Sequence, residues 1–233
     1  MSEPTFPPLF AGEELTGRAD PFERARAQAI AGCDPGTIVY NLSREALRAA
    51  IVFGPEVPLE EAMVMLPACG VGFQNALGSL APPEVAVHLE WDGNIRVNGA
   101  RCGHLKAGAS TRDGAAEPDW LVIGLHLDLL FSDDAPGENP DKTALYEEGC
   151  ADVEAQSLLE AWVRHTLYWI NRWNDEGTRP LHAAWRELAH DVGEPVQFCG
   201  IAGTFVGVDE QFGALLRDGE KTHLVHLSQL LEN

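Results

Sequence analysis

Two closely spaced turn signals constrain the fold of this chain more than any other feature of its sequence. Residues 84–107 read EVAVHLEWDGNIRVNGARCGHLKA, and they contain Asp92-Gly93 and Asn98-Gly99. Such dipeptides favour the tight turns that join neighbouring antiparallel strands. We therefore predict a meander in which VAVHLEW, the short strand NIRVN and a strand after Gly99 lie side by side.

The segments before the meander predict one helix and two strands. DPFERARAQAIAG reads as a helix with Asp20 as its cap, Pro21 in its first position and Gly32 at its end. GTIVYN and LRAAIVF are short and rich in β-branched residues, which is typical of strands. Residues 1–19 hold several prolines and predict an extended arm.

Longer helices flank an apolar strand in the rest of the main domain. Residues 59–80 have a helical pattern, which Pro67 and Gly70 should bend or split. Gly70-Val71-Gly72 indicates close helix packing rather than a phosphate-binding loop. DWLVIGLHLDLLF predicts a buried strand. Residues 154–175 predict the longest helix, with an aromatic stripe that packs in the core, and a shorter helix follows.

The character of the sequence changes after Gly193. QFCGIAGTFVGVDEQFGALLRDGEKTHLVHLSQLLEN is a string of short strands with Gly and Asp-Gly turns. A stretch this short cannot build a large core of its own, so we predict a small barrel-like β domain that rests on the main domain. Strands and helices do not alternate regularly, which indicates an α+β domain over residues 1–194 and a β domain over residues 195–233.

The charge of the chain excludes some classes of partner. Sixteen Lys and Arg stand against 36 Asp and Glu, which gives a formal net charge of −20. Binding to nucleic acid or to an anionic membrane requires a concentrated basic face, and the sequence contains none. No run of apolar residues is long enough to span a bilayer. We therefore expect no nucleic acid and no membrane as a partner.

The cysteines and the N-terminal segment favour a cytoplasmic protein. Five cysteines lie far apart and form no Cys-x-x-Cys pair: Cys33, Cys69, Cys102, Cys150 and Cys199. Such a set is typical of reduced thiols that pack as small buried residues. The start, MSEPTFPPLF, has neither the basic region nor the apolar region of a signal peptide.

No standard catalytic or metal-binding motif is present in the sequence. It contains no Walker loop, no Gly-x-Gly-x-x-Gly after a strand, no Gly-x-Ser-x-Gly and no His-Glu-x-x-His. His223 and His226 should face opposite sides of a strand. His88 and His104 could be neighbours across strands, but no third ligand accompanies them. We therefore predict no metal site.

The meander itself offers a candidate ligand site. Trp91, Asn94 and Arg101 lie at one hairpin edge and could hold a planar ring and an anionic group. Arginine suits a carboxylate or a phosphate because its guanidinium donates two parallel hydrogen bonds and keeps its charge. A packed surface hairpin without a ligand is the alternative interpretation.

Four segments together resemble the biotin protein ligases. EWDGNIRVNGARCGHLKA is similar to the segment in which Lys-Trp-Pro-Asn-Asp opens a hairpin in that family, and LEEAMVMLPACGVGFQNALGSL resembles the helix before it. DWLVIGLHLDLL resembles the later strand that family members write as Val-Ile-Gly-x-Gly-Ile-Asn. GTFVGVDEQFGALLRDGEKTHLVHLSQLL looks like their SH3-like C-terminal domain. The resemblance implies a class II synthetase-like mixed sheet flanked by helices, with a small SH3-like β-barrel.

The resemblance also implies a chemistry and a set of site residues. In such ligases biotin or lipoate attacks the α-phosphate of ATP with Mg²⁺ present, and the acyl group then passes to a lysine of a carrier domain. Arg101 falls at the position of the central catalytic lysine. The implied substrate-binding or nucleotide-binding residues are Arg44, Trp91, Asn94, Gly103, Lys106, Gly124 and Asp128.

Departures from the family pattern leave two hypotheses open. The Gly/Arg-rich loop that covers the adenylate is reduced to YNLSREAL, the motif lysine becomes Glu90, and Pro-Asn becomes Asp92-Gly93. The chain could be an ATP-dependent ligase of the biotin/lipoate group that uses Arg101. It could instead be a binding or regulatory protein that lost adenylation and holds a small carboxylic acid or a biotinyl or lipoyl carrier domain. A homodimer is plausible in either case.

Overall fold

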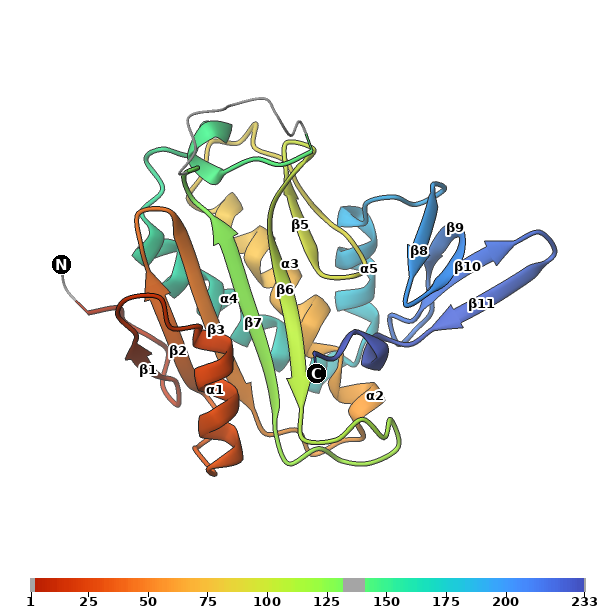
Figure 1. The fold of residues 1–233 in the computed structure, drawn as a ribbon, viewed down its shortest axis with the longest axis horizontal. Coiled ribbons are helices and arrows are strands. Elements are labelled where there is room, and N and C mark those ends of the chain that lie inside the picture. The colour runs from red at the N-terminus through yellow and green to blue at the C-terminus, as the bar shows by residue number, and fades with distance from the viewer. Residues whose placement is uncertain (1–2, 132–140, 233) are drawn as a thin grey trace.

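The larger of two sheets has seven strands and confirms the expected mixed architecture (Figure 1). The computed structural model describes residues 3–131 and 141–232. The strand order is β1-β2-β3-β7-β6-β5-β4; β1 pairs with β2 in parallel, and the other pairs are antiparallel. The strands are β1 (Ala11–Glu14), β2 (Thr37–Leu42), β3 (Ala46–Phe53), β4 (Val87–Leu89), β5 (Asn94–Val97), β6 (Ala100–Ala109) and β7 (Leu121–Asp128). β1 therefore lies within the predicted extended arm.

The predicted meander is present as β4, β5 and β6. Asn98 and Gly99 connect β5 to β6 with φ angles of 50° and 95°, both in the left-handed region that this kind of turn requires. Gly93 has a φ of 98°, and a Cβ there would lie 2.4 Å from the Leu105 carbonyl oxygen. A larger residue cannot occupy that position without moving the backbone of β6.

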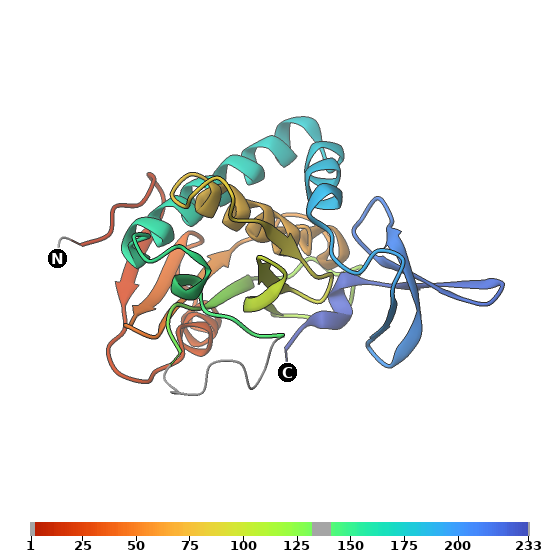
Figure 2. The same ribbon diagram turned by 90° about the horizontal axis from the view of Figure 1, so that it is seen from above.

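Helices cover both faces of the large sheet. Figure 2 shows α3 and α4 on one side and α1 on the other. The larger hydrophobic core lies under α3 and α4, and a smaller one lies under α1. None of the helices in the described ranges is both long and apolar enough to cross a membrane. The helices are α1 (Pro21–Ile30), α2 (Leu59–Ala62), α3 (Met65–Gly78), α4 (Ala155–Glu176) and α5 (Arg179–Leu188), with 3₁₀ turns η1 (Leu145–Glu148) and η2 (Leu227–Leu230).

The break in the helical pattern of residues 59–80 falls earlier than predicted. The helix is interrupted at Met63 and Val64, between α2 and α3, and α3 continues through both Pro67 and Gly70. Pro67 is the third residue of α3, where backbone N–H groups have no partner within the helix. A proline there removes no helical hydrogen bond, so the prediction of a break at this residue was wrong.

The predicted close helix packing occurs between α3 and α4. A Cβ on Gly72 would lie 2.8 Å from Thr166 Oγ1 and 3.0 Å from the Thr166 backbone nitrogen. Trp162 of α4 also donates its indole N–H to the Cys69 carbonyl oxygen of α3 at 3.0 Å. The missing side chain at position 72 therefore sets how closely the two helices approach.

Substituting Gly72 with alanine should destabilise the protein. The new methyl group meets backbone atoms that cannot rotate away, and overpacking of this kind costs about 1–3 kcal/mol. Gly78 is a matched control in the same helix because it is exposed and its Cβ would meet only Gln74 at 3.7 Å. G78A should be neutral or stabilising. Urea denaturation of both variants tests this expectation, and equal stabilities would contradict it.

The C-terminal strands form a second, smaller antiparallel sheet. Its order is β11-β10-β9-β8, with β8 and β11 at the two edges. No closed barrel is found among the described residues, so the barrel part of the prediction is corrected to an open four-stranded sheet. The strands are β8 (Pro195–Phe198), β9 (Ile201–Val208), β10 (Ala214–Asp218) and β11 (Lys221–Val225).

Most of the cysteines lie in the positions that the sequence suggests. Cys69, Cys102 and Cys150 are buried, and no disulfide joins any of the described cysteines. Burial raises the pKa of the Cys69 thiol far above its usual value, so this group is unreactive. Cys199 is exposed and differs from the expectation of a buried residue.

Candidate functional site

A hollow of about 290 Å³ lies on the α1 face of the large sheet. It is bounded by the first residues of α1 and by strands β3, β7 and β6, and Figure 1 shows α1 over this face beside β7. We call it the α1 hollow. The lining residues that carry chemistry are Asp20, Phe22, Arg48, His104, Lys106 and His126.

The register of the sheet places three of these side chains in one row. Arg48 of β3 is the direct partner of His126 of β7, and His126 is the direct partner of His104 of β6. Neighbouring strands are about 4.8 Å apart, and partners in adjacent strands share a face. Lys106 is two residues farther along β6, so it lies on the same face. Four nitrogen-bearing side chains therefore gather on one part of this face.

Arg48 is the cation of the hollow that has no carboxylate partner among the residues that the structure describes. Its side chain is half-buried, and within the described ranges it makes no ion pair or side-chain hydrogen bond. Its guanidinium is therefore available to an anion that enters the hollow.

Lys106 is held at the opposite side of the hollow by two groups of α1. Its Nζ lies 3.2 Å from Asp20 Oδ2 and 4.3 Å from the centre of the Phe22 ring. Asp20 also caps α1, because its Oδ1 accepts the Phe22 backbone N–H at 2.9 Å. Gly124 leaves space for this arrangement, since a Cβ there would lie 2.8 Å from Phe22 Cδ2.

The two histidines of the hollow are stacked on one another. The ring centres of His104 and His126 are 5.2 Å apart, with an angle of 14° between their planes. His126 Nε2 lies 3.0 Å from Asp128 Oδ1. Burial, together with the charges of His126 and Lys106, lowers the pKa of His104 below its usual value. At neutral pH, His104 therefore carries less positive charge than a free histidine would.

A second polar cluster surrounds Glu90 at the end of the meander. The Glu90 side chain is 3% exposed, and its carboxylate accepts hydrogen bonds from Arg101 Nε at 3.0 Å and Arg101 Nη2 at 2.8 Å. Arg96 Nε donates to the same carboxylate, and Asn94 Nδ2 donates at 2.9 Å. Burial acts to raise the pKa of Glu90, but these arginine hydrogen bonds outweigh it and hold the pKa below its usual value. Both arginines are therefore committed to one buried carboxylate.

Trp91 joins the meander to the small sheet. The residue is 3% exposed, and its indole N–H donates to the Phe212 carbonyl oxygen at 2.7 Å. The ring also lies 4.8 Å from the Phe198 ring, centre to centre. These contacts use both the face and the polar atom of the tryptophan within the protein.

The residues predicted for the site are divided between these places. Lys106 and Gly124 lie in the α1 hollow, and Asp128 contacts it through His126. Gly103 is buried in β6, where a Cβ would lie 2.3 Å from the His126 carbonyl oxygen. Arg101, Trp91 and Asn94 belong instead to the Glu90 cluster and its surroundings. Arg44 is exposed in the three-residue connection between β2 and β3.

Three nitrogen-bearing side chains of the hollow were not among the predicted site residues: Arg48, His104 and His126. Arg48 stands alone among apolar residues in ALRAAIVF, and such a charge in a buried strand was the available signal. His126 occupies the position at which the motif Val-Ile-Gly-x-Gly-Ile-Asn has its second glycine. His104 was considered only as a neighbour of His88. That pairing is wrong, because His88 lies opposite Arg96.

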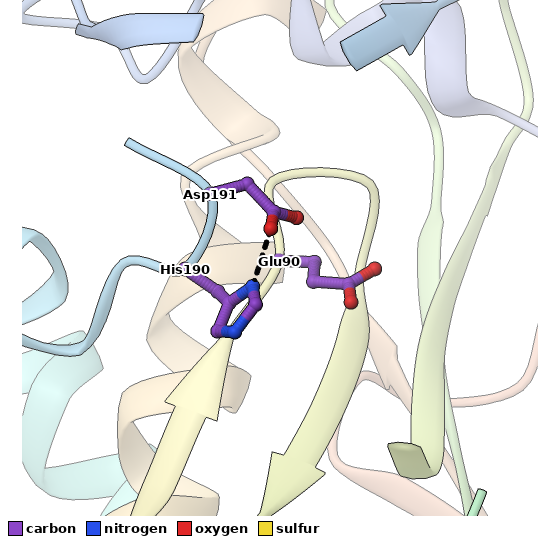
Figure 3. A group of neighbouring side chains, drawn as sticks. All are labelled: Glu90, His190 and Asp191. Atoms are coloured by element: carbon purple, nitrogen blue, oxygen red, sulfur yellow. Dashed lines mark ion pairs between the residues drawn. The ribbon is translucent and has the colours of Figure 1, made fainter. Parts of the chain in front are cut away.

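Glu90 also belongs to the one described group of side chains with spacing suited to a metal. Possible ligand atoms of Glu90, His190 and Asp191 lie within 4.8 Å of one another, and Figure 3 shows His190 paired with Asp191. The His190 Nδ1 to Asp191 Oδ1 distance is 2.6 Å. Arg96 and Arg101 bind the Glu90 carboxylate and would repel a cation there, so this geometry does not favour a metal.

Comparisons with known sequences cover almost the entire chain. Residues 6–187 match the biotin/lipoate A/B protein ligase family, and residues 192–233 match a domain of unknown function, DUF4444. No curated protein matches the sequence.

Solved structures with the same fold include one similar sequence and several distant ones. A biotin protein ligase-like protein of unknown function from Silicibacter sp. TM1040 is 56% identical, with 99% of this chain and 100% of that chain covered and a TM-score of 0.94. A mutant of the Aquifex aeolicus biotin protein ligase in complex with biotin is 17% identical, with 94% and 96% covered and a TM-score of 0.73. The ligase from the same organism in complex with biotin and ATP is 16% identical, with 92% and 95% covered and a TM-score of 0.72.

Proposed function

The chain belongs to the biotin/lipoate A/B protein ligase family, and from that premise we propose that it binds a small carboxylic acid in the α1 hollow without converting it to an acyl-adenylate. The observation that carries the proposal is the distribution of cations. Among the described residues, Arg48 is unpartnered in the hollow, whereas Arg101 is bound by Glu90.

The hollow has the charge and the shelter that a carboxylate needs. Arg48 offers a planar pair of donors, and Lys106 offers an ammonium group that also contacts Asp20. Charge-assisted hydrogen bonds of this kind are about twice as strong as neutral ones, and they gain strength where protein displaces water. The Phe22 ring supplies an apolar wall for the rest of a small ligand.

The Glu90 cluster opposes adenylation. An α-phosphate or a carboxylate that took Arg101 would have to displace the buried Glu90 carboxylate, which accepts two charge-assisted hydrogen bonds from its guanidinium. The short β2–β3 connection adds a second obstacle, because it consists of only Ser43, Arg44 and Glu45. Ser43 Oγ is also hydrogen-bonded to the backbone of Ala46. It is too short to fold over a nucleotide and exclude water from it.

Adenylation remains the second candidate function, and the solved complexes favour it. A ligase with the same fold is known in complex with biotin and ATP. On this alternative, Arg101 would leave Glu90 when ATP and Mg²⁺ bind, and biotin or lipoate would be activated and passed to a lysine of a carrier domain. The two functions differ in whether pyrophosphate is released.

Two assays on the intact chain separate the candidates. We expect at least one of biotin, lipoate and octanoate to raise the melting temperature by about 5–10 °C at a hundredfold excess over Kd. We expect no acid-dependent exchange of pyrophosphate into ATP with Mg²⁺ present. Exchange would support the ligase, and the absence of any melting shift would contradict acid binding.

A further inference from the structure

We propose that His104 and His126 take up one proton between them when an acid binds in the α1 hollow, so that the hollow holds acids more tightly as the pH falls. This inference rests on the proposed acid-binding function and adds the regulation of that site by pH. The geometry of two imidazole rings on neighbouring strands carries it.

The stacked arrangement limits the pair to one proton. The ring centres are 5.2 Å apart and the planes are nearly parallel, so two protonated rings would place like charges in contact. Burial and the charges of His126 and Lys106 already lower the pKa of His104. Near neutral pH, without a bound acid, His104 is therefore protonated less often than a free imidazole would be.

The charges around the pair leave room for an added anion. The cations and carboxylates that line the hollow or act on His104 are Arg48, Lys106, Asp20, Asp128 and Glu232. Two of the carboxylates already have a partner, because Asp20 pairs with Lys106 and Asp128 lies 3.0 Å from His126. Arg48 has no such partner in the described ranges. A carboxylate that enters next to Arg48 adds negative charge beside the rings and favours a protonated imidazole.

The sign of the effect follows from linkage. An anion that raises the pKa of the pair binds together with a proton, so affinity is highest below the pKa of the free pair. Affinity falls as the pH rises through the pKa of the complex and is constant above it. Uptake of one proton limits the change to about tenfold per pH unit. The ligand carboxylate stays ionised above about pH 5.5, so its own titration does not produce the effect.

Calorimetric titration across pH tests the proposal. The probes are octanoate and biotin, with octanamide and biotinamide as uncharged controls, between about pH 5.5 and 8.5. We expect an acid to bind about 5–10-fold more tightly at the lower end of this range. Its binding heat should depend on the ionisation enthalpy of the buffer, which reports proton uptake. The amides should show neither effect.

Variants test whether the pH dependence of acid affinity comes from His104 and His126. In H104Q/H126Q the ratio of the affinities at the two ends of the pH range should fall to about one. H223Q removes a histidine from β11, far from the hollow in sequence and sheet, and should keep the wild-type ratio. Melting curves confirm that each variant is folded.

Three outcomes overturn the inference. An acid that binds equally across the pH range leaves the acid-binding function standing and removes the proton uptake. A pH dependence that persists in H104Q/H126Q assigns the proton to another group. If neither acid binds at any pH and lipoate gives no melting shift either, the proposed function and this inference fail together.

Discussion

Replacing Glu90 with alanine is expected to lower the free energy of unfolding by about 3–5 kcal/mol. The side chain of Arg96 is only 9% exposed and donates to Glu90, and Arg101 donates two more hydrogen bonds to it. Removing the carboxylate leaves a buried guanidinium without its counter-charge, and a cavity forms as well. Asp141 cannot replace Glu90, because its carboxylate is 55% exposed and pairs with Arg96 from the outside. Urea denaturation at neutral pH measures the change.

The matched control for this variant is Glu56→Ala. Glu56 is exposed and its loss should change stability by less than about 0.5 kcal/mol. A free energy of unfolding for E90A within about 1 kcal/mol of the wild-type value would contradict a buried Glu90–Arg96 ion pair.

The ion pairs of Glu90 should also make the free energy of unfolding depend on pH in the acid range. Because arginine hydrogen bonds hold the pKa of Glu90 below its unfolded value, the carboxylate contributes stability above that unfolded value. This contribution is lost as the pH falls through the folded-state pKa. The stability difference between the wild type and E90Q should therefore narrow in acid, and a constant difference would contradict the pKa direction.

The double variant R48A/K106A is expected to bind acids at least about 100-fold more weakly than the wild type. A hydrogen bond to a charged group contributes about 1.5–3 kcal/mol, and two such contacts are removed. R101A should change the affinity by less than about threefold, because Arg101 is bound to Glu90 and lies outside the hollow. Calorimetry with biotin, lipoate and octanoate measures the affinities of the wild type, R48A/K106A and R101A.

Lys221→Ala controls for the loss of positive charge in a chain of net charge −20. Lys221 is exposed at the start of β11 and lines no part of the α1 hollow. Wild-type affinity in R48A/K106A, or loss of binding in R101A with a normal melting curve, would place the acid elsewhere.

The fold was predictable because local signals specified it. Asn98-Gly99 specifies a turn with two left-handed residues, and the structure has this turn. Asp20 and Pro21 mark the start of α1 in the same way. Whether the C-terminal strands close into a barrel was not predictable. Short strands and turn residues identify a sheet, but they do not say whether its edge strands meet. Here β8 and β11 remain at opposite edges.

The hollow was not predictable from local signals. Arg48 and His126 are far apart in the sequence, and they become neighbours because β7 inserts beside β3 in the strand order. Alternation along one strand gives the face of a side chain, but it does not give the strand that lies beside it. Lys106 and Gly124 entered the prediction only through the family resemblance.

The effect of the Glu90 charge depends on which residues the sheet places beside it. In the sequence it reads as a repulsive substitution beside a phosphate site. In the sheet, Arg96 and Arg101 are direct partners on β5 and β6, so two cations face one another. Like charges in such a pair destabilise the sheet unless an anion lies between them. Glu90 is that anion, and Trp91, Asn94 and Arg101 have their spacing because they pack around the end of the meander.

The most direct test of the account is a crystal structure of the chain soaked with biotin or octanoate. We expect the carboxylate to lie within hydrogen-bond distance of Arg48 or Lys106 in the α1 hollow, and Arg101 to stay on Glu90. A carboxylate bound to Arg101, with Glu90 displaced, would contradict it.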